Sequence, residues 1–363
     1  MSIIVNDQKL LQFVQAVFQT FGVAPDQAHI CAENLVLADL RGIPSHGVAR
    51  LKRYVDGMIN GTILPLAAPE IVREAPSTAT IDGHAGLGQV VAHFATELAI
   101  AKARQSGVGV VTVRNSNHYG IAGYYSQMML EAGLLGISMT NSAPLVVPTF
   151  GKEMIIGTNP ISLTAPTRRN RPFFLDMATA VVPRGKLEVY DRLGKALPQG
   201  WAVDAEGRVT TSAAEVLKNM TSRAGGGILP LGGAGELFSG YKGYGMAVLV
   251  DILCGVLSGG AYGDRVDSKG PHGENQPAEV AHFFMALRIE NFVELEIFQD
   301  KMDDFIDRLK ASAKADGANR IFIHGEKEYE LFEKHKQEGV PLEEKVYEIL
   351  KSIGAQRGVA FSL

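Results

Sequence analysis

The spacing of hydrophobic residues divides the chain into alternating strands and helices. Residues 108–113 (VGVVTV) form an apolar, β-branched run, which is typical of a buried strand. A polar stretch follows at 114–120, then a segment of helical periodicity at 121–132 and a second short strand at 134–140. This order predicts a strand–loop–helix–strand unit. Because ligands of open α/β sheets bind beyond the carboxyl ends of strands, the loop at 114–120 is a candidate site.

The same periodicity predicts the rest of the architecture. Further helices are expected at 6–20, 25–40, 45–60, 88–105, 244–257, 296–314, 326–337 and 341–353. Further strands are expected at 78–81, 161–165, 172–176, 281–289 and 320–324. We therefore predict an α/β protein with a helical domain from residues 1–75 and 326–363. A mixed-sheet domain is expected from 76–325, with a small helical, glycine-rich insertion near 212–260.

Composition excludes several classes of protein. The 363 residues are 46% hydrophobic and carry a formal net charge of −4, so no basic excess indicates nucleic-acid binding. No run approaches the ~20 apolar residues of a membrane span. Cys31 and Cys254 lie in apolar helical patterns and are expected to be buried thiols of a cytoplasmic protein. The sequence contains no zinc-site spacing, no P-loop and no G-x-G-x-x-G fingerprint of a Rossmann domain.

The loop at 114–120 carries the first candidate chemistry. Asn117 and His118 stand just beyond the end of the predicted strand. An imidazole that titrates near neutral pH can accept a proton from a hydroxyl group or donate one to a carbonyl group, while Asn117 holds the oxygen. The alternative interpretation is a loop histidine that is bonded to a backbone carbonyl group.

A second candidate site begins at Ser45, which follows a proline and is a typical helix-start residue. We expect one helix over 45–60, with His46, Arg50 and Tyr54 on one face near its start. An arginine binds a carboxylate through two parallel hydrogen bonds, and a helix start offers free N–H groups to the same anion. The alternative is a surface helix whose arginine is solvated.

Three further features have competing interpretations. Lys242 and Gly243 stand near the start of an apolar helix, where they suit either a pyrophosphate or ordinary helix capping. Asp176 ends a predicted strand, and it suits either a ribose hydroxyl group or a helix cap. The eight glycines of 225–243 suit either a phosphate-binding loop or, as we favour, a flexible loop.

Together these segments resemble the type 2 malate/L-lactate dehydrogenase family, which also includes ureidoglycolate dehydrogenase, sulfolactate dehydrogenase and diketogulonate reductase. The resemblance is carried, in chain order, by RGIPSHGVARLKRY at 41–54, VRNSNHYGIAGYY at 113–125, GTNPISLTAP at 157–166, DMATAVVPRGK at 176–186, PQGWAVDAEGRVTT at 198–211, GYKGYGMAVLVDIL at 240–253 and AHFFMALRIENF at 281–292. It implies a mixed-sheet α/β fold of the family's own, distinct from a Rossmann domain. It also implies a homodimer without metal that uses NAD or NADP.

The resemblance implies roles for individual residues. His118 would be the acid/base, with His46 as the second candidate. The substrate would be held by Ser45, Arg50, Tyr54 and Asn117. The cofactor would be held by Ser142, Gly157, Thr158, Asn159, Pro160, Asp176, Met177, Ala178, Lys186, Lys242, Gly243, Gly325 and Glu326. The chain departs from the family pattern where His324 replaces a proline before Gly325 and Glu326, and where Ala281 replaces a glycine.

The expected activity is hydride transfer between a nicotinamide and a small 2-hydroxy or 2-oxo acid. Malate/oxaloacetate and L-lactate/pyruvate are the leading substrates. One alternative is ureidoglycolate dehydrogenase or a reductase of cyclic imines such as piperideine-2-carboxylate on the same fold. Another is a catalytically inactive relative that only binds a dinucleotide or a partner. The presence of His118, Arg50 and Lys242 argues against an inactive relative.

Overall fold

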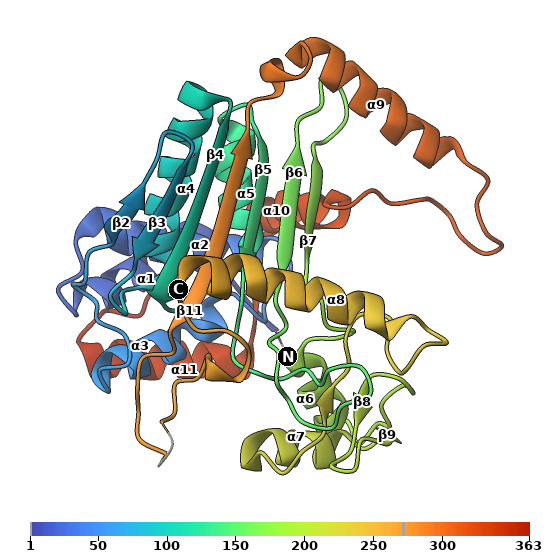
Figure 1. Ribbon diagram of the computed structural model, residues 1–363. Coiled ribbons are helices and arrows are strands. Elements are labelled where there is room, and N and C mark those ends of the chain that lie inside the picture. Colours follow the sequence, from blue (N-terminus) through green and yellow to red (C-terminus); the bar gives the residue numbers. More distant parts are fainter. Residues whose placement is uncertain (1, 271–272) are drawn as a thin grey trace.

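A computed structural model describes residues 2–270 and 273–363 of the chain (Figure 1). The α-helices are α1 Asp7–Gln19, α2 Pro25–Leu40, α3 Leu51–Ile59, α4 Gly88–Ser106, α5 Ala122–Glu131, α6 Arg184–Arg192, α7 Ala213–Ser222, α8 Gly240–Asp251, α9 Leu295–Ala311, α10 Glu326–Glu338 and α11 Glu344–Arg357. The strands are β1 Ser2–Val5, β2 Glu70–Glu74, β3 Thr78–Asp82, β4 Val108–Ser116, β5 Leu135–Thr140, β6 Ile161–Ala165, β7 Phe173–Met177, β8 Ala202–Val203, β9 Val209–Thr210, β10 Gly227–Ile228, β11 Val280–Leu287 and β12 Val340–Glu343. Short 3₁₀ turns occur at Val48–Arg50, Gly263–Arg265 and Ile289–Asn291, and a π turn at Ile252–Val256.

A mixed sheet of seven strands forms the centre of the molecule, in the order β2-β3-β4-β11-β5-β6-β7. Within this described sheet β3 and β4 pair in parallel, and the other neighbours pair antiparallel. β11 lies between β4 and β5 and runs opposite to both, so β4 and β5 point the same way without touching. The strand–loop–helix–strand unit that we predicted at 108–140 is therefore split by a strand from much later in the chain.

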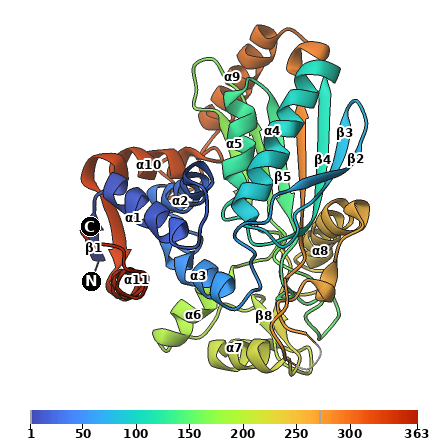
Figure 2. The same ribbon diagram turned by 90° about the vertical axis from the view of Figure 1, so that its left-hand side faces the viewer.

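Helices α4 and α5 cover one face of the sheet (Figure 2). Small residues let α4 approach closely: Ala92, Ala95, Ala99 and Ala103 are fully buried. A Cβ atom at Gly109 of β4 would lie only 1.9 Å from the Ala99 carbonyl oxygen, so the strand needs glycine at this crossing.

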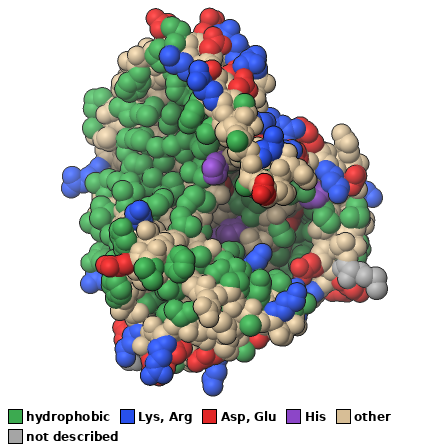
Figure 3. Space-filling model, turned by 90° about the vertical axis from the view of Figure 1, so that its right-hand side faces the viewer, with side chains coloured by type: hydrophobic (Ala, Val, Ile, Leu, Met, Phe, Trp, Pro, Cys, Tyr) green, Lys and Arg blue, Asp and Glu red, His purple; other side chains and the backbone are tan. Residues whose placement is uncertain are grey.

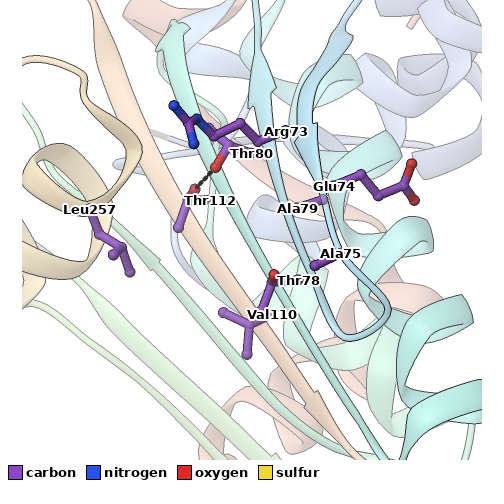
Figure 4. Close-up of a pocket in the computed structure, with 9 residues that line it drawn as sticks. All are labelled: Arg73, Glu74, Ala75, Thr78, Ala79, Thr80, Val110, Thr112 and Leu257. Carbon is purple, nitrogen blue, oxygen red and sulfur yellow. Dashed lines mark hydrogen bonds between the residues drawn. The ribbon is translucent and has the colours of Figure 1, made fainter.

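The opposite face of the sheet is largely open. Of the described elements, only α8 and the π turn that follows it cross this face, near the sheet edge at which β4 ends (Figures 1 and 2). Hydrophobic side chains form a continuous surface beside a hollow that contains histidine side chains (Figure 3). A cavity of about 580 Å³ opens on this face beside Thr80, Val110, Thr112 and Leu257, with the Thr112 hydroxyl group 3.1 Å from that of Thr80 (Figure 4).

A second core joins the two ends of the chain. Apolar side chains of α1, α2 and α3 pack with Leu350 and Ile353 of α11 in one buried cluster. β1 pairs antiparallel with β12, with Val5 opposite Val340. A third, smaller core lies between α6, α7 and the three-stranded sheet β10-β8-β9, where Leu187 and Val216 are fully buried.

Most of the predicted helices and strands are present within a few residues, but three predictions are wrong. Residues 45–47 are not helical, because the chain first forms the turn at Val48–Arg50 and enters α3 only at Leu51. Residues 320–324 form no strand. Among the described residues, their backbone makes a single hydrogen bond to β7, from the Phe174 N–H group to the His324 carbonyl oxygen, 3.2 Å long. The helix expected at 244–257 is interrupted by the π turn.

Other elements were not predicted. Some are short strands without a clear alternating pattern, such as β1, β2 and β12, and the helices α6 and α7 were not predicted either. Both cysteines are buried free thiols, as predicted. Within the described residues, every helix is too short or too polar to span a bilayer.

Candidate active site

One edge of the central sheet gathers most of the predicted site residues. β4, β5 and β7 end at this edge, whereas β6 and β11 begin there. His118 follows β4, Ser142 follows β5, residues 157–160 precede β6, and Asp176 is the penultimate residue of β7. The topology therefore brings together residues from stretches that are far apart in the sequence.

The loop that carries His118 is held by tight packing against the start of α4. A Cβ atom at Gly88 would lie 2.3 Å from the Asn117 carbonyl oxygen and 2.4 Å from that of His118, so this approach requires glycine. The Asn117 side chain donates through Nδ2 to the carbonyl oxygens of Ala85 and Gly86, both at 2.9 Å. Because both amide hydrogens are engaged, Asn117 fastens the loop and has no donor left for a substrate.

A buried carboxylate anchors the same loop from β3. Asp82 is 6% exposed and accepts hydrogen bonds from the Arg114 Nε atom at 3.0 Å and from the Asn115 Nδ2 atom at 2.9 Å. The backbone N–H group of His84 donates to it at 3.0 Å. Burial raises the pKa of Asp82, but these hydrogen bonds outweigh burial and leave the pKa below its usual value. The ends of β3 and β4 are thereby locked together.

Three aromatic side chains meet at this loop. The rings of His46 and His118 stack with 5.6 Å between centroids and 23° between planes. The Tyr54 hydroxyl oxygen lies 2.6 Å from His118 Nδ1, and the backbone N–H group of Gly120 donates to the same nitrogen at 3.3 Å. The Ser45 hydroxyl oxygen lies 2.9 Å from His46 Nδ1. The segment before α3 and the loop after β4 thus form one site.

Burial and nearby arginines favour the neutral form of both histidines. Burial lowers the pKa of His118 well below 6.5, and the charges of Arg53, His46 and Arg50 lower it further. Burial, with the charges of Arg50 and Arg53, lowers the pKa of His46 to about 4. The expectation that His118 titrates near neutral pH is therefore wrong for the free protein, because the site is both enclosed and positively charged.

Arg50 and Arg53 supply this charge without acidic partners. The Arg50 Nε atom donates to the Ser45 carbonyl oxygen at 2.5 Å, and neither guanidinium forms an ion pair with a described residue. The N–H group of Val48, which starts the turn before α3, donates to the Asp39 carboxylate at 2.7 Å. An anion at this site would therefore meet guanidinium groups, and not the free helix N–H groups that the sequence suggested.

A buried histidine of the central sheet packs against the residue next to His118. His282 of β11 is fully buried, with Nδ1 2.7 Å from the Thr140 hydroxyl oxygen and Nε2 2.8 Å from the Ser116 hydroxyl oxygen. Its ring stacks on Tyr119 at 4.5 Å and 6°. Burial lowers its pKa to about 3, so a neutral ring braces the residue next to His118.

The predicted cofactor residues at the ends of β5 and β6 are also connected. The Ser142 hydroxyl oxygen accepts a hydrogen bond from the Thr158 N–H group at 3.1 Å. Asn159 donates through Nδ2 to the Asp251 carboxylate at 2.8 Å, which ties residues 157–160 to α8. The Asn159 Oδ1 atom is buried without a hydrogen-bond partner in the described part of the chain.

Backbone contacts extend this group to the start of α8. The Thr179 N–H group donates to the Thr158 carbonyl oxygen at 2.9 Å, and the Leu231 N–H group donates to the Thr179 carbonyl oxygen at 2.8 Å. A Cβ atom at Gly243 would lie 2.1 Å from the Leu231 carbonyl oxygen, so α8 approaches this loop through glycine. Lys242 is exposed in the first turn of α8.

Asp176 acts as a helix cap, one of the two interpretations of its sequence position. Its carboxylate accepts a hydrogen bond from the Gly123 N–H group in the first turn of α5 at 2.8 Å. Burial raises the pKa of Asp176 to about 6. Met177 completes β7 and Ala178 follows it at the same edge of the sheet.

The remaining cofactor candidates lie at the starts of two other helices, α6 and α10. Lys186 is exposed in the first turn of α6. Gly325 is the N-cap residue just before α10 and has a positive φ of 92°. The Glu326 carboxylate pairs with Lys310 at 2.5 Å and with Arg320 at 3.2 Å, so this side chain is engaged within the chain.

Sequence reasoning missed four residues of the site. Arg53 had a signal, because it lies three positions after Arg50 on a helix. Asp39, Gln89 and His282 had none, since each lies in an apolar stretch and their contacts depend on the fold. Within the described residues, no group of three histidine, cysteine or acidic side chains is arranged to hold a metal ion.

Comparisons with known proteins place the whole chain. The profile of the malate/L-lactate dehydrogenase family matches residues 5–351. A malate dehydrogenase of Pyrococcus horikoshii is 51% identical over 98% of this chain and 96% of its own length. An L-sulfolactate dehydrogenase of Methanocaldococcus jannaschii is 39% identical over 98% of this chain and 96% of its own length. The crystal structure of a malate dehydrogenase of Entamoeba histolytica superposes with a TM-score of 0.95 at 33% identity and covers all of both chains.

These matches confirm the family, the mixed α/β fold and the oxidoreductase class that the sequence motifs implied. They extend over both histidines, both arginines and the sheet edge that gathers the predicted cofactor residues. The chain therefore belongs to the malate/L-lactate dehydrogenase family.

Proposed function

We propose that the protein is an NAD(P)-dependent 2-hydroxyacid dehydrogenase whose substrate pair is malate and oxaloacetate. The observation that carries this proposal is the pair of guanidinium groups, Arg50 and Arg53, without acidic partners beside the stacked rings of His46 and His118. Malate and oxaloacetate have two carboxylates, whereas lactate and pyruvate have one, so two free arginines favour the dicarboxylates. The 51% identical relative is named a malate dehydrogenase. Sulfolactate, which also carries two negative charges, is the second candidate.

In the proposed mechanism Arg50 orients the carboxylate next to the reacting carbon, and His118 exchanges the proton of the substrate oxygen. A bound dianion offsets the charges of Arg50 and Arg53, which raises the pKa of His118 toward its ordinary range. The ring can then be protonated in the complex and donate its proton during reduction. His46, stacked on His118, is the second candidate donor.

We propose that the cofactor lies along the sheet edge formed by Ser142, residues 157–160 and 176–178, Lys186 and the start of α8. The buried, unpartnered Asn159 Oδ1 atom offers an acceptor there, and the exposed ammonium groups of Lys186 and Lys242 suit a pyrophosphate. When bound, the nicotinamide supplies or accepts the hydride. This mode of binding NAD or NADP does not use a Rossmann fingerprint, which the sequence lacks. Gly325 and Glu326 remain candidates for a contact to it.

We further propose a homodimer whose interface includes the open face of the sheet. Large hydrophobic side chains are exposed on α8 and the turn after it, namely Met246, Leu249, Ile252, Val256 and Leu257. Exposed apolar patches of this kind mark interaction surfaces. Sedimentation of the purified protein tests this: a single species of about 39 kDa, the mass of one chain, would exclude the dimer.

We propose two domains, a helical unit of residues 1–69 and 326–363 that carries Arg50 and a sheet unit of residues 70–325 that carries His118. The boundary expected at residue 75 moves to the start of β2, because β2 pairs with β3 in the central sheet. The two buried free cysteines support a cytoplasmic location, where thiols stay reduced.

The test of the activity is the change in nicotinamide absorbance with a panel of substrates. We expect turnover of oxaloacetate to exceed that of pyruvate, ureidoglycolate and a cyclic imine. Turnover of none of these, with intact cofactor binding, would indicate an inactive relative that only binds the dinucleotide.

Arg53→Gln separates the dicarboxylate from the monocarboxylate. We expect kcat/KM for oxaloacetate to fall by about 10–100-fold, since a charge-assisted hydrogen bond of about 1.5–3 kcal/mol is lost, while the low rate with pyruvate changes little. The exposed Arg192→Gln serves as the matched control. An equal loss with both substrates would contradict the role of Arg53 in binding the second carboxylate.

A further inference from the structure

The Tyr54 side chain has an environment that a substrate contact does not explain. Tyr54 is fully buried in α3, and its hydroxyl oxygen lies 2.6 Å from His118 Nδ1. Its ring packs against His118 with 5.9 Å between centroids. A side chain with no exposed surface cannot contact a substrate that enters from solvent without a rearrangement.

The hydrogen bonds around His118 define the state of its ring. A backbone N–H group only donates, so the contact of 3.3 Å from Gly120 makes Nδ1 an acceptor. The Tyr54 hydroxyl group then donates to the same lone pair. The proton of the neutral ring is therefore on Nε2, which has no partner among the described residues and is not enclosed by them.

Gln89 completes the arrangement behind Tyr54. It follows Gly88 at the start of α4, is fully buried, and neither atom of its amide group has a hydrogen-bond partner in the described part of the chain. The same amide group lies close enough to Tyr54 to lower the pKa of that phenol, although burial raises it overall. A buried amide without partners is costly unless it has a second state in which it is satisfied.

We propose that Tyr54 and Gln89 are a pair of positioning residues that hold His118 in both protonation states. With the neutral ring, the Tyr54 hydroxyl group donates to Nδ1, and the Gln89 amide group has no hydrogen-bond partner in the described part of the chain. With the protonated ring, Nδ1–H donates to the hydroxyl oxygen, and the hydroxyl group turns to donate to Gln89 Oε1. Nε2 faces the cleft in both states. During reduction the protonated ring gives its Nε2 proton to the substrate oxygen, and the neutral ring that remains keeps the Nδ1 proton, which it still donates to the Tyr54 hydroxyl oxygen.

This inference rests on the proposed function of His118, and it changes the role that the resemblance implied for Tyr54. A substrate-binding Tyr54 would act on KM, whereas a Tyr54 that acts through His118 affects kcat. Tyr54→Phe keeps the buried ring and removes only the hydroxyl group. Tyr124→Phe is the matched control, because its hydroxyl group makes an equally short bond of 2.6 Å, to Glu33.

We expect Tyr54→Phe to lower kcat for oxaloacetate about 10–100-fold with KM within twofold of wild type, while Tyr124→Phe changes neither. Gln89→Met should lower kcat less, and the double variant should be no slower than Tyr54→Phe, because Gln89 acts only through Tyr54. A tenfold rise in KM at unchanged kcat, or additive losses in the double variant, would overturn the proposal.

A second measurement does not depend on turnover. In protein labelled with ¹⁵N-histidine, the His118 Nδ1 resonance, assigned with His118→Gln, should show an unprotonated, hydrogen-bonded nitrogen. In Tyr54→Phe it should move toward the value of a nitrogen without that bond. If the wild type turns over no substrate, the proposed function fails while this measurement still tests the contact. An unchanged resonance in an active enzyme refutes the role of Tyr54 alone.

Discussion

Replacement of Gly88 by alanine should slow catalysis without touching a catalytic side chain. The added Cβ atom would lie 2.3 Å from the Asn117 carbonyl oxygen and 2.4 Å from that of His118, whereas ordinary contacts begin near 3.4 Å. The loop must therefore shift by about 1 Å, and a displacement of this size costs about 10²-fold in rate when it misplaces a reacting group. Overpacking should also cost about 1–3 kcal/mol of stability, partly offset by the better helix propensity of alanine.

The assay for Gly88→Ala is kcat at saturating substrate and cofactor, with thermal unfolding measured in parallel. Gly245→Ala is the matched control, because it also lies in a helix and its added Cβ atom would meet no heavy atom within 4 Å. A Gly88→Ala protein with kcat within twofold of wild type would refute the reasoning, since the loop would then tolerate the shift or the site would lie elsewhere.

Three further predictions concern the acid/base residue and two buried carboxylates. His118→Asn should lower kcat by about 10²–10⁴-fold, measured at saturating substrate with cofactor binding as the folding control; a variant that keeps most of its turnover would remove His118 from the mechanism. Asp303→Ala should lower the free energy of unfolding, measured in denaturant titrations, by about 2 kcal/mol. The reason is that the fully buried Asp303 carboxylate accepts hydrogen bonds from the N–H groups of residues 168–170. Replacement of the exposed Asp304 by alanine is the control and should change the free energy of unfolding little. Those bonds outweigh burial and lower the pKa of Asp303, so its contribution should be present above pH 4 and lost as the pH falls below that value. The pKa of Asp176 is raised, so its effect on stability has the opposite pH dependence: its contribution is present below pH 4 and lost as the pH rises to about 6. Asp176→Asn should therefore remove a decline of about 3 kcal/mol in the free energy of unfolding over that pH range. An unchanged pH profile of stability would show that the carboxyl group ionises freely.

The sequence predicts those parts of the fold that local pattern determines. Helices such as α1 and α9 have enough turns for apolar periodicity to define them, and β6 has the predicted bounds. The motif around His118 also indicates a strand end, because polar loop residues follow a β-branched run. These signals are local in the chain, which is why they can be read without the fold.

The remaining features depend on contacts between distant residues. The sequence of the segment before α3 predicts a helix from Ser45. In the structure the Asp39 carboxylate of α2 accepts a hydrogen bond from the Val48 N–H group, and the α-helix begins only after this turn. The low pKa of His118 arises from burial and from arginines 65 and 68 positions earlier in the chain, so the sequence suggested a ring that titrates near neutral pH. Asn117 suggested a substrate donor, but its amide hydrogens bind the turn after β3, which no local pattern indicates.

The position of β11 has a consequence for the order in which the protein forms during synthesis. Within the described sheet β4 and β5 are joined only through β11, which pairs with both, and β11 lies about 140 residues beyond β5. A ribosome that has translated His46, Arg50 and His118 has therefore not yet produced the strand that closes the sheet behind them. Pairing at such sequence separation is slow, and the emerging edges of β4 and β5 stay available to other chains. Release of the nascent chain after about residue 290, and not after 120, is thus the step at which a working site first becomes possible.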